Sequence, residues 1–327
     1  MGTHKTGTTA IQAFSVANRE ALLRQGIHYP DFSPMANGPN TGHHAWAHAF
    51  SSKPQGLSRD QAQALTRHWH DRALEQQHAV VVSAEAMYRH VLGQGDFAAQ
   101  RTAYLEVLRE VLAGFEVVPV LVFRRPDDYI RSMYQEAVAY RSVPRVLPAF
   151  ADYVSKPPPG IDYADNAAFV EAVFGKLKVL LYEDLAASSA SLGEAFYEAL
   201  GVPLDGCSPA ARVRASLSAE ETVLKNQANQ HLASRQESQA FIESLRTPGM
   251  QDRIRQAYPA PPYDLWPDAA SRQAFLDSRS DDIARLRERY FPARDRLFPP
   301  LDEARQAIPV PPPPAELMEQ ALARLPG

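Results

Sequence analysis

The chain has 327 residues, of which 45% are hydrophobic, enough for one large α/β domain or two smaller ones. Its net charge of −4 argues against broad binding to nucleic acid or anionic membranes, and it shows no signal peptide and no apolar run as long as a membrane helix. Cys207 is the only cysteine, which excludes an internal disulfide framework and fits a reducing compartment. We therefore expect a cytoplasmic protein without nucleic-acid or membrane partners.

Short aliphatic runs alternate with helical patterns, which is typical of an α/β fold with a mostly parallel sheet and crossover helices on both faces. The runs "HAVVVSAE" and "EVVPVLVFRRP" are continuously apolar, as expected for strands buried on both faces. The predicted strands are residues 27–29, 79–83, 117–123 and 177–182. The predicted helices are residues 8–24, 58–77, 98–113, 126–141, 164–174, 188–200, 218–245 and a late one from about residue 280.

Two regions lack this alternation. Residues 31–50 are predicted to be a long functional loop over the strand ends. Residues 201–300 look helical and carry no second set of strands, and "IPVPPPPAEL" near the end predicts a stiff polyproline linker to a short last helix. We therefore expect residues 1–200 to form the α/β core, and residues 201–327 a helical cap and proline-rich tail of the same domain.

The first ten residues, MGTHKTGTTA, predict a loop that binds a phosphate at the start of a helix. Glycines let the backbone approach a ligand, consecutive N–H groups at a helix N-terminus bind oxyanions, and Lys5 adds a positive charge. The Walker A pattern needs a lysine directly after its second glycine, but Thr8 follows Gly7 here, which argues against a typical ATPase or GTPase. On its own, the loop is equally compatible with a turn that merely caps a helix.

A second cluster lies in "VLVFRRPDDYIRSMYQE", where a buried strand ends at Phe123 and Arg124 and Arg125 follow it. Pro126 suits the first turn of the next helix, and the two aspartates after it suit the positive end of that helix. An arginine at a strand end and Ser132 on the next helix can hold one phosphate from two sides. The alternative is that both arginines pair with surface acids.

At these residues the sequence resembles sulfotransferases that use 3′-phosphoadenosine 5′-phosphosulfate (PAPS). "KTGTT", "FRRPDDYIRSMY" and "VLLYEDL" are similar, in this order, to the three signature segments of that family over roughly residues 1–200, and "RYFPARDRLF" in the tail also resembles bacterial members. The resemblance implies a P-loop-like fold, with Arg124 and Ser132 on the 3′-phosphate and Tyr182 near the adenine. For the 5′-phosphosulfate it implies a loop comprising Gly2, Lys5, Thr6, Gly7, Thr8 and Thr9.

The sequence departs from the family pattern at three places. Ala10 stands where cytosolic animal enzymes have a tryptophan that stacks on adenine, and their late arginine-lysine-glycine segment has no clear counterpart beyond "RVRASLSAEE" at residues 212–221. The first, central strand of the fold is missing ahead of Gly2. We therefore expect Met1 to be an internal start or the chain to be a fragment, with a damaged sheet and doubtful activity if it does begin there.

Sulfuryl transfer needs an aligned acceptor, charge stabilisation on the departing phosphate and a base, but no metal. Lys5 and the loop N–H groups are the candidates for the leaving group. Glu85, which follows the strand in "VVVSAE", is the first candidate for the base if burial raises its pKa, and His43 and His44 are the second. A structural ion pair for Glu85, or an exposed histidine pair, would explain the same residues. His44 and His48 have helical metal-ligand spacing, but no third ligand is evident.

The sequence therefore predicts an enzyme that transfers a sulfuryl group from PAPS to a hydroxyl or amine and releases PAP, the 3′,5′-bisphosphate. A carbohydrate acceptor would suit the polar loop that carries His43 and His44. Two alternatives stay open: a P-loop nucleotide kinase or NTPase, and a truncated, non-catalytic relic that binds a nucleotide.

Overall fold

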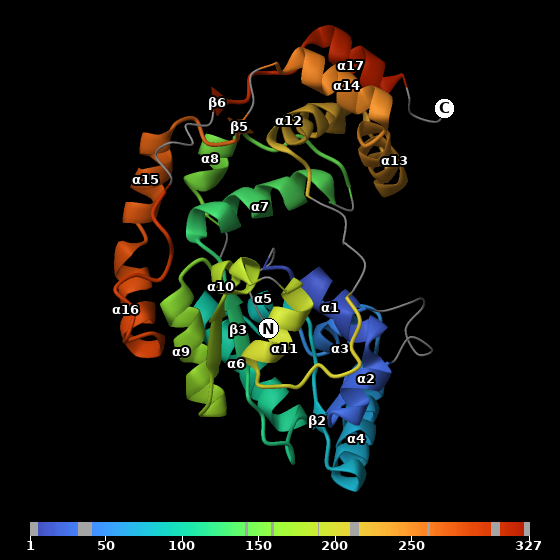
Figure 1. Ribbon diagram of the computed structural model, residues 1–327, viewed down its shortest axis with the longest axis vertical. Helices are drawn as coiled ribbons and strands as arrows, with labels where there is room; N and C mark the ends of the chain where they lie inside the picture. Colours follow the sequence, from blue (N-terminus) through green and yellow to red (C-terminus); the bar gives the residue numbers. More distant parts are fainter. Residues whose placement is uncertain are drawn as a thin grey trace. The chain divides into compact units, whose positions relative to one another are not determined.

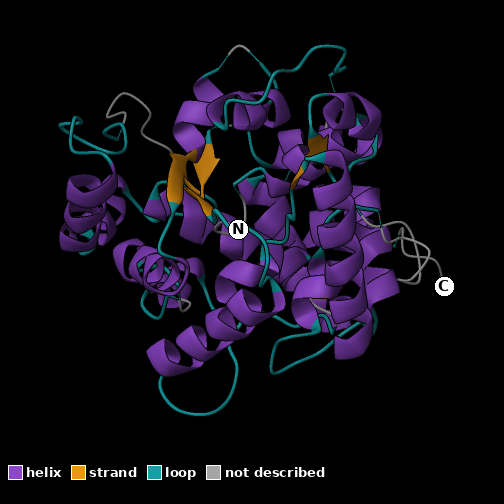
Figure 2. Ribbon diagram, turned by 90° about the horizontal axis from the view of Figure 1, so that it is seen from below, coloured by secondary structure: helices purple, strands orange, loops and turns teal. Residues whose placement is uncertain are grey.

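The computed structural model describes residues 6–31, 41–140, 143–157, 160–188, 190–209, 216–259, 262–301 and 308–323. The fold is mixed α/β and 57% helical, and its strands are few and short (Figure 2). All the strand pairs are parallel, as the sequence predicts, but they form separate two-stranded sheets instead of one continuous sheet. The pairs are β1 (Ile27–His28) with β2 (Ala79–Val80), β3 (Val120–Phe123) with β4 (Lys178–Leu181), and β5 (Tyr263–Asp264) with β6 (Ile308–Pro309).

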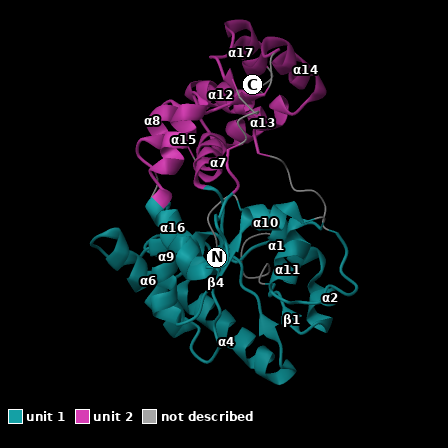
Figure 3. Ribbon diagram, turned by 60° about the vertical axis from the view of Figure 1, so that its left-hand side comes forward, with its two compact units in different colours: residues 1–125, 159–213, 281–298 teal, residues 126–158, 214–280, 299–327 magenta. Residues whose placement is uncertain are grey.

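The chain divides into two compact units whose segments alternate along the sequence (Figure 3). The first comprises residues 1–125, 159–213 and 281–298, and the second comprises residues 126–158, 214–280 and 299–327. This division differs from the expected boundary at residue 200. The helix that follows β3 belongs to the second unit, and a late helix belongs mostly to the first.

The first unit contains β1 to β4 and their connecting helices (Figure 1). Packing joins distant segments here: α1 contacts α11, α6 contacts α9, and Phe14 of α1 packs with Leu22 and Tyr197 in a buried cluster. Its helices are α1 (Thr8–Ala17), α2 (Arg19–Arg24), α3 (His44–His48), α4 (Arg59–Gln76), α5 (Ala86–Arg89), α6 (Phe97–Val111), α9 (Tyr163–Phe174), α10 (Tyr182–Ala187), α11 (Leu192–Ala199) and most of α16 (Ser280–Tyr290).

The second unit is helical apart from the short β5–β6 pair, and its core gathers leucine, methionine and aromatic side chains such as Leu224, Phe241, Met250 and Leu317. Ser218 and Glu221 form a reciprocal capping box at the start of α12, which satisfies backbone N–H groups there. Its helices are α7 (Pro126–Ala139), α8 (Phe150–Val154), α12 (Ala219–Ala228), the 3₁₀ turn η1 (Asn229–His231), α13 (Arg235–Leu245), α14 (Pro248–Ala257), α15 (Ala269–Asp277) and α17 (Ala315–Leu322).

Two predictions need correction. The region expected to lack strands contains β5, which pairs with β6 in the proline-rich tail through Ile308 N–H to Pro262 O (3.0 Å) and Val310 N–H to Asp264 O (3.1 Å). A two-residue strand is too short to give a periodic pattern, and Pro309 is tolerated because an edge strand need not donate from every residue. The predicted loop 31–50 contains α3, whereas residues 32–40 lie outside the described residues.

Within the described ranges, no helix combines the length and the apolar character that crossing a membrane requires.

Candidate functional site

The loop that opens α1 brings predicted residues against the end of β4. Gly7 is the N-cap residue of α1 with φ +77°, a conformation that favours glycine, and as a glycine it supplies no side-chain cap. A Cβ atom added to Gly7 would lie 3.5 Å from Cε2 of Tyr182 and only 2.7 Å from Cδ1 of Leu192. The glycine backbone therefore lies directly beside the tyrosine that the third signature segment singled out.

The neighbouring loop residues differ in exposure. Thr6 and Thr8 are buried, and Thr9 is exposed on the first turn of α1. Gly2 and Lys5 lie outside the described residues, so the predicted roles of these two residues stay predictions. The N-terminus of α1 thus offers the positive end of its helix dipole beside a glycine without a side chain, an arrangement that suits an anion.

The β3–β4 register places Arg124 beside Tyr182. Phe123 pairs with Leu181 at the last position of both strands, so the residues that follow emerge side by side. The guanidinium carbon of Arg124 lies 4.7 Å from the centroid of the Tyr182 ring, within the range of a cation–π contact. Tyr163 supports this strand end because its hydroxyl donates to the backbone carbonyl of Arg124 (2.9 Å).

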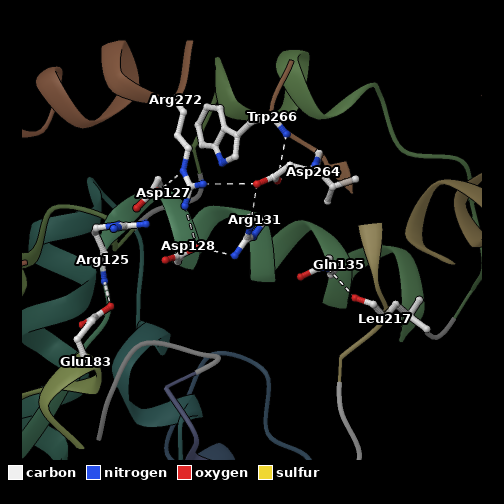
Figure 4. A network of polar contacts seen from close by, with 11 residues as sticks. Arg125, Asp127, Asp128, Arg131, Gln135, Glu183, Leu217, Asp264, Trp266 and Arg272 are labelled. Carbon is white, nitrogen blue, oxygen red and sulfur yellow. Dashed lines mark hydrogen bonds and ion pairs between the residues drawn. The ribbon is translucent and has the colours of Figure 1, made fainter. Parts of the chain in front are cut away.

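The segment after Tyr182 is fixed by polar contacts. The backbone N–H of Arg125 donates to Glu183 Oε1 at 2.8 Å (Figure 4). Asp184 forms a bidentate ion pair with Arg294, which comes from the tail segment "RYFPARDRLF". Two segments quoted for the family resemblance are therefore joined in space, a pairing that their separation in sequence does not reveal.

The candidate bases occupy different surroundings. The Thr8 hydroxyl donates to Glu85 Oε1, which brings the half-buried carboxylate to the start of α1. His44 is half-buried at the first position of α3. His43 is buried between Tyr29 and Trp69, with ring-centroid distances of 4.8 and 5.8 Å.

The surroundings of His43 favour a neutral ring. Its Nδ1 accepts from the backbone N–H of Ser83 (3.1 Å), a role that requires an unprotonated nitrogen. Burial lowers the pKa of His43 to about 4. Such a ring is a weak base, and we therefore carry Glu85 forward as the first candidate.

Ser132, the other residue predicted on the 3′-phosphate, belongs to the second unit. It is buried in α7, in the same helix as the aspartates expected to complement the helix dipole. Those aspartates lie in the first turn of α7, as the sequence predicts, and they also form ion pairs: Asp127, whose side chain is fully buried, pairs with Arg272, and Asp128 pairs with Arg131 and Arg272 (Figure 4). No pattern in the sequence pointed to Arg272, which is 145 residues from Asp127.

His44 and His48 have the helical spacing of metal ligands, although the sequence predicts no metal site. Among the described residues, no group of three or more His, Cys, Asp or Glu side chains could hold a metal ion. His48 instead contacts the His90 ring (4.3 Å between centroids), and burial lowers the pKa of both histidines.

Comparison of the chain with models of protein families, with curated proteins and with solved structures gives no match in any of the three. The functional argument therefore depends on the residues of this chain alone.

Proposed function

We propose that the chain is a PAPS-dependent sulfotransferase with a P-loop-like nucleotide site, which moves a sulfuryl group to a hydroxyl or amine of an acceptor such as a carbohydrate. The observation that supports this best is the convergence of Gly7, Tyr182 and Arg124, one from each signature segment, within the first unit. Proteins pack many unrelated segments together, but these three residues come from the three segments that would all have to contact one molecule of the donor.

The residues fit the donor in charge and shape. The start of α1, where the N-cap residue Gly7 has no side chain, suits the 5′-phosphosulfate because N–H groups and the helix dipole favour an anion there. Arg124 supplies a cation for the 3′-phosphate, and its position over Tyr182 places a flat aromatic face next to that cation, where the adenosine would lie. Lys5 completes the proposed set, and the role of Ser132 on the 3′-phosphate stays a prediction from the sequence.

In the proposed reaction, an acceptor oxygen attacks sulfur while the bond between sulfur and the 5′-phosphate oxygen breaks. Glu85 takes the acceptor proton, and the Thr8 hydroxyl that donates to Glu85 holds the carboxylate at the start of α1. Lys5 and the N–H groups of the loop stabilise the charge that develops on the departing phosphate.

The decisive experiment is calorimetry with PAP and with AMP, which lacks the 3′-phosphate. We expect Arg124→Ala to weaken PAP binding roughly 10- to 150-fold, since a hydrogen bond to a charged group contributes about 1.5–3 kcal/mol. AMP affinity should change little. Arg125→Ala is the matched control because it removes the neighbouring guanidinium at the same strand end and keeps the backbone N–H that donates to Glu183.

Equal losses for PAP and AMP would reject the role of Arg124. Tighter binding of Mg-ATP than of PAP would favour the kinase or NTPase, and binding of PAP without transfer of label from PAPS to any acceptor would favour the relic. An acceptor screen that includes oligosaccharides and amines follows once PAP binding is established.

A further inference from the structure

A fully buried arginine in the first unit has no counter-ion. Arg101 lies in the second turn of α6 and is 0% exposed. Its Nη1 donates to the backbone carbonyl of His90 (2.9 Å), whereas its Nε and Nη2 have no hydrogen-bond partner among the described residues, and it forms no ion pair with any of them. Burying a charged group is costly unless it is paired, so this guanidinium needs an anion that the described chain does not provide.

The two nitrogen atoms without a partner lie on the same edge of the guanidinium. In the planar group, Nη1 is on the side of Cδ, so the N–H bonds of Nε and Nη2 point in parallel from the other edge. This edge can donate two hydrogen bonds to two oxygen atoms of one carboxylate, sulfate or phosphate group. The geometry of the unused donors therefore specifies an oxyanion as the ligand.

The first unit contains no acidic side chain that fills this role. The acids closest to Arg101 in the sequence, Asp96 and Glu106, are each five residues away, whereas neighbours on a helix face are three or four residues apart. Asp96 instead accepts from the backbone N–H of Ala99 (2.8 Å), and Glu106 is exposed. The residues of this unit outside the described ranges include no aspartate and no glutamate.

Two histidines extend the cluster from Arg101 to the surface. The guanidinium carbon of Arg101 lies 5.8 Å from the centroid of the Tyr104 ring. The His90 ring lies 5.4 Å from the Tyr104 ring and 4.3 Å from the His48 ring, between centroids. Both histidines are half-buried, and His90 Nε2 and His48 Nδ1 have no hydrogen-bond partner within the described ranges. Each of these nitrogen atoms can donate to an anion when its ring is protonated.

The charges around this cluster also favour an anion. Burial lowers the pKa of Arg101 to about 10, and the contributions that oppose this shift come from Tyr104 and Tyr88. Burial likewise lowers the pKa of His90 to about 3. The charges that lower it further are all those of basic side chains, namely His48, Arg101, Arg89 and His44. A bound anion would offset these repulsions.

We propose that Arg101, His90 and His48 form a binding site for one small oxyanion. Two oxygen atoms of the ligand accept from Nε and Nη2 of Arg101, and the histidine rings donate to it once they are protonated. The ligand is either a free inorganic oxyanion or the carboxylate group of a larger molecule, because both offer the required pair of oxygen atoms. This site uses none of the residues assigned to the sulfate donor, and the inference does not depend on the proposed function.

The test follows the His90 ring by NMR of the full chain with isotope-labelled histidine. Inorganic sulfate and, separately, sodium acetate are titrated at constant ionic strength. We expect a saturable shift of the ring signals and a rise in the pKa of His90 of at least about one pH unit, since a nearby anion favours the charged imidazolium. Affinity should therefore increase as the pH falls.

Tighter binding of sulfate than of acetate would identify a tetrahedral inorganic oxyanion as the ligand, and the reverse order would identify a carboxylate. If neither anion gives a saturable shift, the proposal is wrong.

Arg101→Lys keeps the positive charge but removes the planar pair of donors. We expect it to weaken sulfate binding at least about tenfold, which corresponds to the loss of one hydrogen bond to a charged group. Arg109→Lys makes the same change at an exposed position of α6 and should leave the affinity unchanged. Equal affinities of the Arg101→Lys variant and the unaltered chain would contradict the proposal.

A second variant covers the case in which Arg101→Lys does not fold. His90→Gln, followed through the His48 ring, should weaken sulfate binding at least about threefold, and an unchanged affinity would refute the role of His90.

Sulfate could also reach the proposed donor site, and Arg124→Ala distinguishes the two locations. A His90 shift that survives in Arg124→Ala and is weakened in Arg101→Lys supports the separate oxyanion site. A shift that is lost in Arg124→Ala and kept in Arg101→Lys would overturn it. The titration uses no nucleotide, so its outcome is independent of the outcome of the PAP experiment.

Discussion

Replacing Gly7 with alanine tests whether the opening loop is crowded against the β4 end. Gly7 has φ +77°, and a methyl group there would come within 2.7 Å of Leu192 Cδ1. The left-handed conformation costs an L-residue about 1–2 kcal/mol, and overpacking adds about 1 kcal/mol because the Leu192 side chain can rotate away. We therefore expect Gly7→Ala to lower the free energy of unfolding by about 2–3 kcal/mol.

Gly201→Ala is the matched control. Gly201 has the same φ of +77°, but nothing lies within 4 Å of the position of its added Cβ atom. Both variants therefore share the cost of placing an alanine in the left-handed conformation, and only Gly7→Ala adds the close contact with Leu192. Their difference, about 1 kcal/mol, measures the crowding alone.

The assay is urea unfolding followed by the fluorescence of Trp46 and Trp69, which are both buried in the first unit. Leu192→Ala should remove the extra loss in a double-mutant cycle, since that side chain is the one that the new methyl would meet. Equal destabilisation by Gly7→Ala and Gly201→Ala would refute the crowded loop. If the Gly7→Ala variant binds PAP as tightly as the unaltered chain, the loop at Gly7 is not part of the donor site.

Three further predictions concern the base, the pH dependence and the second unit. Glu85→Gln should lower turnover at least about 100-fold at unchanged PAP affinity, and His44→Ala should not; if both variants stay active, the base lies elsewhere. Folding lowers the pKa of His43 from 6.5 to about 4, so the unfolded state binds more protons between these pH values and the free energy of unfolding falls as the pH falls from 6.5 to 4. In urea unfolding, His43→Gln should lose about 3 kcal/mol less than the unaltered chain over that range, and an equal pH dependence of both proteins would contradict this prediction. Arg272→Met removes the guanidinium that pairs with the fully buried Asp127 and should destabilise the second unit by about 3–5 kcal/mol, whereas Arg255→Met removes an exposed pair and should cost at most about 1 kcal/mol by thermal unfolding.

The strands and the longer helices followed from local patterns. β1 to β4 fall within the predicted strand ranges because short aliphatic runs bounded by polar residues mostly form buried strands in an α/β chain. Their lengths could not be predicted: β2 ends at Val80 although the apolar run continues to Val82, because pairing needs a neighbour and β1 is only two residues long. The same reason separates the predicted single sheet into two.

Side-chain surroundings were less accessible from the sequence. The buried position of His43 depends on Tyr29 and Trp69, which come from different segments, so the local sequence could not decide between a buried ring and the exposed alternative. Asp127 lies in the first turn of α7 as predicted, but its ion pair with Arg272 could not be predicted because that arginine is distant in sequence. Local rules identify which residues carry chemistry, but long-range packing decides whether solvent can reach them.

The association of Arg124 with Tyr182 shows where sequence reasoning can go further than local pattern. Each residue follows a predicted strand, and in a parallel pair the carboxyl ends of both strands lie at the same edge. Phe123 and Leu181 are paired at the last position of the two strands, so the next residues, Arg124 and Tyr182, become neighbours through this register alone. A shift of one residue would change which side chains face each other there. The donor-site proposal therefore depends on one quantity that the sequence did not supply, the register of β3 and β4, and a cross-link between cysteines placed at Arg124 and Tyr182 would measure it directly.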